Sequence, residues 1–183
     1  HLTHAYETPA NQLNIAYKGT AIRLDPGAGG VARGSQWMIF DTDTMRVSTA
    51  WQSSTDAKTD RFIDWRDIQF NGEHGIHPRV VGEVSYANSI GPGWGEPKSG
   101  SFVDDQRVEG RDQRRYGPLP RHWAKFRGLY HYDSKVILSY SVGTAEVLEL
   151  PGQVTLAEVS LPAIFRRTLN IGPRDHDLVL QVA

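Results

Sequence analysis

The chain has 183 residues, which is enough for one sizeable domain. Its 39% hydrophobic and 22% charged residues are typical of a globular protein, and its formal net charge of −1 gives no bulk attraction to nucleic acid or to an anionic membrane. No apolar run reaches the roughly 18 residues that a transmembrane helix requires. We therefore expect one domain with no nucleic-acid partner and no membrane insertion.

The chain contains no cysteine. Disulfides, thiolate metal ligands, a cysteine nucleophile and covalent haem attachment are therefore excluded within it. Because cytosolic proteins usually keep a thiol, this composition favours an exported protein, either periplasmic or extracellular. The first residues do not form a basic and then apolar leader, so we expect any signal peptide to have been removed or to lie outside this sequence.

Alternating and apolar runs predict strands along most of the chain. Residues 15–24 alternate and end at a Gly-rich turn, and residues 37–40 and 45–51 flank a short Asp-Thr-Asp-Thr connection. The clearest meander joins residues 128–132, 136–142 and 146–150 through turns of about three residues, a length that antiparallel hairpins prefer. Further strands are predicted at residues 62–70, 80–86, 154–160, 163–169 and 178–182.

Roughly ten short strands with turn chemistry between them predict an all-β fold, an antiparallel β-sandwich or a partly open barrel. Residues 87–123 are the exception, because they form a long connection without a strand pattern; their aromatic residues predict an ordered loop excursion that covers one end of the sheet. We expect residues 1–13 to be an N-terminal extension and residues 14–183 to be a single β domain. The strand-like end of the sequence suggests a piece of a longer polypeptide.

Six short segments together carry a family resemblance. They are residues 18–24 (KGTAIRL), 40–43 (FDTD), 71–75 (NGEHG), 117–120 (GPLP), 127–130 (RGLY) and 136–140 (VILSY). Over roughly residues 14–183, the chain resembles an uncharacterised domain of large exported bacterial proteins, found upstream of dehydrogenase-like propeller modules and haem c (PVC-type haem-binding) modules. The resemblance implies an oxidoreductase-type parent that acts on carbohydrate or a related small molecule, with haem c in the parent rather than in this chain.

Residues 71–78 cluster a carboxylate and two imidazoles, Glu73, His74 and His77, in one turn. Glycines on both sides of the Glu-His pair free the backbone, and Pro78 restricts it at the end. Such a turn can face a ligand, and its side chains also suit copper or zinc. The alternative is a turn in which the imidazoles hydrogen-bond to the backbone.

Two further groups of residues suggest metal ions. His1 and His4 suggest copper bound by an N-terminal histidine and a second imidazole; the alternative is a disordered or tag-like terminus. Asp41 and Asp43, with Asp25, offer oxygen ligands for Ca²⁺, although Asp-Thr-Asp between two apolar runs is more simply a turn.

The aromatic residues divide by context. Trp37, Trp51 and Trp65 lie in predicted strands, so we expect them in the core. Trp94, Tyr116 and Trp123 lie in the excursion, where rings with polar edges are suited to contact a carbohydrate-like ligand.

Charged residues in two places argue against nucleic-acid binding and against a hydrolytic site. Arginines flank Tyr116 in the excursion, but neighbouring Asp and Glu residues cancel their charge, so a solvated loop or a domain-docking surface is favoured over nucleic acid. Glu146 and Glu149 are expected on opposite faces of one strand, which argues against a hydrolytic carboxylate pair.

Three hypotheses of function follow. The first is an exported β-sandwich module of a haem c-linked oxidoreductase-type protein, which binds a carbohydrate-like substrate or docks neighbouring domains and has no catalysis of its own. The second is a copper- or zinc-dependent enzyme built on a histidine cluster. The third is a structural or assembly protein that pairs through edge strands, with the strands around Ile15 and Leu178 as candidates.

Overall fold

The computed structural model describes residues 1–8, 11–54, 62–65, 77–154 and 164–182. The elements in chain order are β1 (Leu2–Thr8), β2 (Asn11–Arg23), the 3-10 helix η1 (Gly30–Arg33), β3 (Gln36–Asp41), β4 (Arg46–Ser53), β5 (Ile63–Asp64), β6 (Arg79–Val80), β7 (Gly82–Ala87), β8 (Val108–Glu109), β9 (Arg115–Tyr116), β10 (Ala124–Tyr132), β11 (Lys135–Val142), β12 (Ala145–Val154) and β13 (Ile164–Ile171). Within these ranges there is no helix long and apolar enough to cross a membrane.

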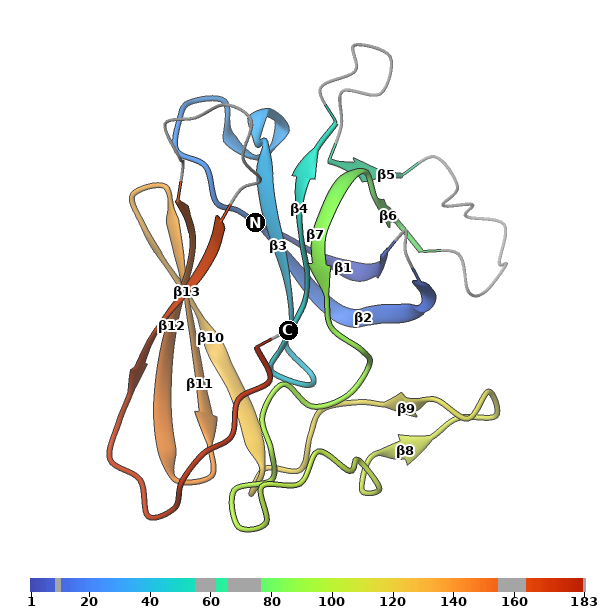
Figure 1. Ribbon diagram of the computed structural model, residues 1–183, viewed down its shortest axis with the longest axis vertical. Helices are drawn as coiled ribbons and strands as arrows, with labels where there is room; N and C mark the ends of the chain where they lie inside the picture. Colours follow the sequence, from blue (N-terminus) through green and yellow to red (C-terminus); the bar gives the residue numbers. More distant parts are fainter. Residues whose placement is uncertain (9–10, 55–61, 66–76, 155–163, 183) are drawn as a thin grey trace.

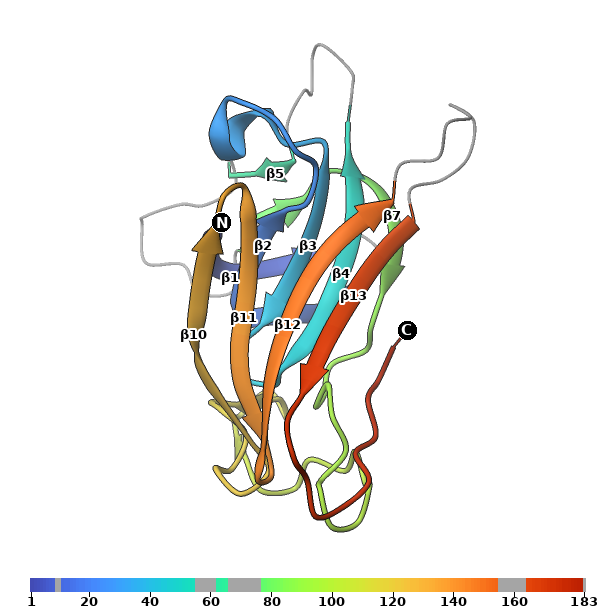
Figure 2. The same cartoon turned by 90° about the vertical axis from the view of Figure 1, so that its left-hand side faces the viewer.

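The strands form two large sheets that face each other, as Figures 1 and 2 show. The first sheet has seven strands in the order β5-β6-β1-β2-β3-β4-β7, and the second has four in the order β10-β11-β12-β13. The short strands β8 and β9 pair as a separate hairpin. Pairing is antiparallel except between β1 and β6, so the predicted all-β sandwich is confirmed.

The core lies on both faces of the seven-stranded sheet. Met38 and Phe40 of β3 pack in the cluster between the two sheets, where the Phe40 ring lies 5.6 Å from the ring of Tyr140 on β11. Trp37 and Ile39, which point the other way, join a second cluster inside the curl of the seven-stranded sheet. Burial on both faces explains why residues 37–40 read as a continuous apolar run instead of an alternating one.

A buried arginine ties the middle of the seven-stranded sheet to the beginning of the excursion. The Arg46 side chain is 1% exposed. Its Nη1 donates to Asn14 Oδ1 at 2.7 Å and to the carbonyl oxygens of Asn88 and Ser89, both at 2.9 Å, while Nη2 lies 3.9 Å from a carboxylate oxygen of Asp41. The cation is thus held mainly by oxygen atoms of the backbone and of an amide.

The predicted meander is present as β10, β11 and β12, joined by turns at residues 133–134 and 143–144. Asp133 and Gly143 adopt positive φ angles of 55° and 56°, which tight hairpin turns require. Glu146 is exposed on β12 and Glu149 is buried, so their expected placement on opposite faces is confirmed.

Some boundaries differ from those expected. Residues 1–13, expected to be an extension, include β1 and the first part of β2, which pair along the sheet. Residues 178–182 do not form a ladder; they make an isolated bridge between Leu180 and Trp94. Trp65, expected in the core, is 39% exposed, because β5 ends at Asp64 and Trp65 follows it at the sheet margin.

The excursion, residues 87–123, is ordered and covers one end of the sandwich, as predicted (Figure 1). The amide of Gly93 donates to the Thr44 carbonyl oxygen at 2.8 Å, and the amide of Leu119 donates to the Asp43 carbonyl oxygen at 2.9 Å. A Cβ atom on Gly93 would lie 2.0 Å from the Met45 carbonyl oxygen, so this close approach to the β3–β4 turn requires glycine.

The edge strands are not those expected. The Ile15 region of β2 lies inside the sheet, with β1 on one side and Arg46 donating to the Ile15 carbonyl oxygen on the other. Leu178 precedes the isolated bridge. In the described part of the chain the sheets end at β5, β7, β10 and β13.

Candidate functional site

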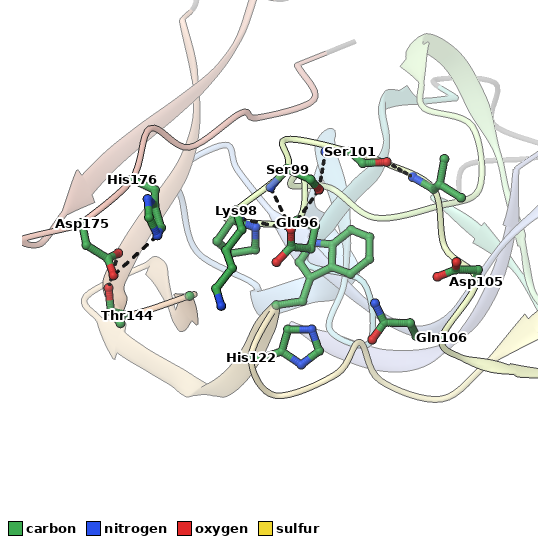
Figure 3. A pocket seen from close by; sticks show the side chains of 14 residues that line it. Glu96, Lys98, Ser99, Ser101, Asp105, Gln106, His122, Thr144, Asp175 and His176 are labelled. Carbon is green, nitrogen blue, oxygen red and sulfur yellow. Dashed lines mark hydrogen bonds and ion pairs between the residues drawn. The ribbon is translucent and has the colours of Figure 1, made fainter.

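A pocket of about 630 Å³ opens at the end of the sandwich that the excursion covers (Figure 3). Three parts of the chain form it: the excursion, the β11–β12 turn, and the segment that follows β13. Its lining residues are Glu96, Pro97, Lys98, Ser99, Ser101, Val103, Asp105, Gln106, His122, Trp123, Gly143, Thr144, Asp175 and His176.

Glu96 builds the turn at the centre of the pocket wall. Its Oε2 accepts hydrogen bonds from the amides of Lys98 and Ser99, at 3.1 and 2.8 Å, and from Ser99 Oγ at 2.8 Å. The hydrogen bond from the Ser99 hydroxyl and those from the two amides lower the pKa of Glu96. This carboxylate therefore acts as the anchor of its own loop.

The lowered pKa of Glu96 predicts a pH-dependent loosening of this turn. Because the folded-state pKa is below that of the unfolded chain, the stabilisation is fully present above the unfolded pKa and is lost as pH falls through the folded one. We expect the amide resonances of Lys98 and Ser99 to titrate together at a pH below the usual glutamate range, with faster hydrogen exchange below it. In Glu96→Gln this titration should disappear; its persistence would assign the transition to another group.

Two buried tryptophans form the base beneath the pocket. Trp123 Nε1 donates to the Trp94 carbonyl oxygen at 2.8 Å, and Trp94 Nε1 donates to the Tyr140 hydroxyl at 3.3 Å. Both side chains are 1% exposed. Trp94 thus packs in the core and does not present a ring to a ligand, whereas Trp123 borders the pocket from below. The excursion uses these rings to hold its own position.

A buried ion pair continues this support into the four-stranded sheet. The Tyr140 hydroxyl donates to Glu149 Oε2 at 2.6 Å, and Arg167 on β13 donates to both Glu149 oxygens, at 2.6 and 3.1 Å. Arg167 Nη1 also donates to the Gln181 carbonyl oxygen at 3.2 Å. The network therefore links the tryptophan base to the segment after β13 that supplies Asp175 and His176.

The remaining polar groups of the pocket fall into two sets (Figure 3). Asp175 accepts from the Thr144 hydroxyl at 2.9 Å and lies 3.8 Å from His176 Nε2, so this side of the wall is internally bonded. Asp105, Gln106 and His122 lie across the pocket, exposed. The loop that carries Asp105 and Gln106 is anchored by Arg107, which donates to Asp104 at 2.7 Å and to the Gly117 carbonyl oxygen at 2.9 Å.

Two of the predicted ligand residues, His77 and Tyr116, meet elsewhere, on either side of Tyr17. The Tyr17 ring lies 4.9 Å from the Tyr116 ring and 6.0 Å from the His77 ring. The Tyr116 hydroxyl donates to Asp112 at 2.6 Å within the β8–β9 hairpin. The hairpin is held against β2 by Tyr17, whose hydroxyl donates to the Tyr116 hydroxyl at 3.4 Å and accepts from Arg114 at 3.3 Å. Burial lowers the pKa of His77. Glu73 and His74 lie outside the described residues, so their expected contact with a ligand stays a prediction.

The structure separates the two histidines expected to share copper. The His1 ring lies 4.8 Å from the His131 ring of β10, whereas the His4 ring lies 5.5 Å from Trp65 at the other side of β1. Across the described ranges, no group of three or more His, Asp or Glu side chains is arranged to hold a metal ion.

The aspartates considered for Ca²⁺ have structural partners. Asp41 Oδ1 accepts from the Asp43 amide at 3.1 Å, which is the turn interpretation. Asp25 accepts from the amides of Ser35 and Gln36, both at 2.9 Å, and from Arg23. Burial alone would raise the pKa of Asp25, but these hydrogen bonds outweigh it and lower the pKa.

The pocket residues other than Trp123 were not among the predicted ligand residues. The sequence pattern favours the aromatic side chains of the excursion as ligand contacts, but Trp94 and Trp123 pack inward and Tyr116 lies outside the pocket. The polar residues Glu96, Asp105 and Gln106 look like ordinary loop composition, and Asp175 and His176 lie some 70 residues away from them in the chain. The one feature of the sequence that points to this site is the length of the excursion, because long connections without strands or helices are often functional.

Comparison with known proteins gives the chain a family. A model of a domain of unknown function, DUF6797, matches residues 38–149, more than half of the chain. The chain belongs to the DUF6797 family. No curated protein and no solved structure matches it. The matched segment of this chain, residues 38–149, runs from β3 to β12. It contains every pocket residue except Asp175 and His176.

Proposed function

We propose that this DUF6797 domain is a carbohydrate-binding module without catalysis of its own. The observation that carries the proposal is the pocket, which has exposed Asp105, Gln106 and His122 in its lining above two buried tryptophans. A volume of about 630 Å³ is in the usual range for small-ligand sites. Sugar hydroxyls both donate and accept, and the carboxylate, amide and imidazole together offer both functions.

The hydrogen bonds that Glu96 and Asp175 already accept within the protein favour ligand binding over hydrolysis as the function of the pocket. Glycoside hydrolysis uses two carboxyl groups that flank the scissile bond, one as acid and one as base or nucleophile. Glu96 is bonded to the amides of its own turn, and Asp175 to Thr144. Asp105 is the carboxylate that remains for a ligand among the described pocket residues.

Binding of neutral oligosaccharides, measured by isothermal titration calorimetry, tests this proposal. Gln106→Ala and His122→Ala should each weaken binding about three- to tenfold, because each removes a hydrogen bond to the ligand. Gln52→Ala, an exposed glutamine on β4 outside the pocket, is the matched control and should bind as the unaltered domain does. Equal affinities for all four proteins would move the site elsewhere, and release of reducing sugar by the purified domain would contradict the absence of catalysis.

We also propose that the domain belongs to an exported parent with haem c modules, as the family resemblance implies. Exposed apolar side chains at Phe102 and Val179, beside a groove of about 530 Å³ formed with residues 89–92, favour contact with neighbouring domains of that parent. The full-length gene decides the context: Cys-x-x-Cys-His motifs downstream would support haem c, and their absence together with a lack of any export signal would refute this part of the proposal.

A further inference from the structure

We infer that the pocket selects carbohydrates that carry a free amino group, with the ammonium bound at Asp105. The inference rests on the proposed carbohydrate binding and names the class of sugar. It follows from the balance of charges around the pocket: the lining contains three carboxylates, Glu96, Asp105 and Asp175, and a single lysine, Lys98. Three carboxylates against one lysine give the lining an excess of acidic over basic side chains.

Two of the three carboxylates are already satisfied within the protein. Glu96 accepts three hydrogen bonds from its own turn. Asp175 accepts from Thr144 and lies beside His176, and the hydrogen bond from Thr144 lowers the pKa of Asp175. Both carboxylates are therefore bonded to groups of the protein itself.

Asp105 is different, because it has no hydrogen bond or ion pair with any described residue. It is exposed, and Figure 3 places it with Gln106 on the side of the pocket away from Thr144 and Asp175. The neighbouring Arg107 guanidinium, which has the opposite charge, is turned away and bonded to Asp104 and the Gly117 carbonyl oxygen. The negative charge of Asp105 is therefore left for a ligand.

This arrangement discriminates between classes of sugar. An ammonium group at Asp105 forms a charge-assisted hydrogen bond, which is roughly twice as strong as a neutral one. An N-acetyl group at the same position loses the charge, and a uronate would meet the excess of carboxylates. Gln106 and His122 remain free to bond the hydroxyl groups that all these sugars share.

The test compares β-1,4-linked glucosamine oligomers with N-acetylated oligomers of the same length, by calorimetry on the whole domain. The glucosamine oligomer should bind about tenfold more tightly, and this preference should shrink in about 0.5 M NaCl, where exposed charges are screened. In Asp105→Asn, which keeps the size and one acceptor, the two oligomers should bind alike. Glu83→Gln removes an exposed carboxylate on β7, outside the pocket, and should retain the preference.

The outcomes separate the two proposals. If both oligomers bind the unaltered domain equally, amine selection is wrong while carbohydrate binding stands. If neither oligomer nor any neutral oligosaccharide binds, the proposed function itself is wrong. A preference that survives in Asp105→Asn, or that Glu83→Gln also abolishes, would show that the overall charge of the domain attracts the amine and would overturn the assignment to Asp105.

Discussion

Replacement of Glu149 by Gln should lower the free energy of unfolding by about 3–5 kcal/mol, the cost of removing one partner of a buried ion pair. Glu149 is 0% exposed and accepts hydrogen bonds from the Tyr140 hydroxyl and from two nitrogen atoms of Arg167. The amide cannot neutralise the guanidinium, so Arg167 would remain charged and largely buried. Urea unfolding followed by circular dichroism measures the loss.

The same strand offers a matched control for this change. Glu146 lies three residues earlier on β12, is exposed and pairs with Arg127 at the surface. Because exposed ion pairs contribute about 0–1 kcal/mol, Glu146→Gln should change stability little. A double variant, Glu149→Leu with Arg167→Leu, should recover much of the stability, since it leaves no unpaired charge. Equal losses for Glu146→Gln and Glu149→Gln would refute the structural role of the buried pair.

We expect a loss of about 3 kcal/mol or more for Arg46→Met, because the change leaves the buried Asp41 carboxylate without its cationic partner and the Ser89 carbonyl oxygen without the donor from Arg46. Methionine fills a similar volume but cannot donate to Asn14 or to the Asn88 and Ser89 carbonyl oxygens. Since the Asn88 and Ser89 carbonyl oxygens lie where β7 passes into the excursion, we also expect faster hydrogen exchange at residues 88–93. Chemical denaturation and exchange mass spectrometry measure the two effects.

Two variants control for the Arg46 prediction. Arg111→Met changes an exposed arginine at the tip of the β8–β9 hairpin and should alter stability by about 0.5 kcal/mol or less. Arg46→Lys keeps the positive charge but not the planar set of donors, so we expect an intermediate loss. A stability of Arg46→Met within about 0.5 kcal/mol of the unaltered domain, the range of a surface change, would refute the structural role of the buried guanidinium.

The sequence indicates the strands well where turns and periodicity agree. The meander 128–150 is an example, because tight turns at Asp133 and Gly143 separate clear apolar runs. Residues 178–182 show the limit: they are apolar enough for a strand, but only the bridge between Leu180 and Trp94 forms. Whether a strand finds a neighbour is decided by the rest of the fold, and local pattern does not contain that information.

The candidate site was less predictable than the fold, for a related reason. Its wall is formed by residues from the ranges 96–106, 122–123, 143–144 and 175–176. A local sequence motif cannot predict a site that combines segments so far apart in the chain. Trp94 and Trp123 are conspicuous in the sequence as large aromatic residues in a loop. Such side chains can contact a ligand, but they can equally anchor the loop to the core. The charge left on Asp105 depends on where Arg107 turns, which only the structure reveals.

The two hydrophobic clusters share one wall, formed by β2, β3 and β4. Neighbouring residues on β3, such as Trp37 and Met38, belong to different clusters although they are joined by one peptide bond. If either cluster came apart, one face of these shared strands would be exposed to water. Because the two clusters depend on the same strands, we expect the domain to unfold as one cooperative unit in spite of its divided core.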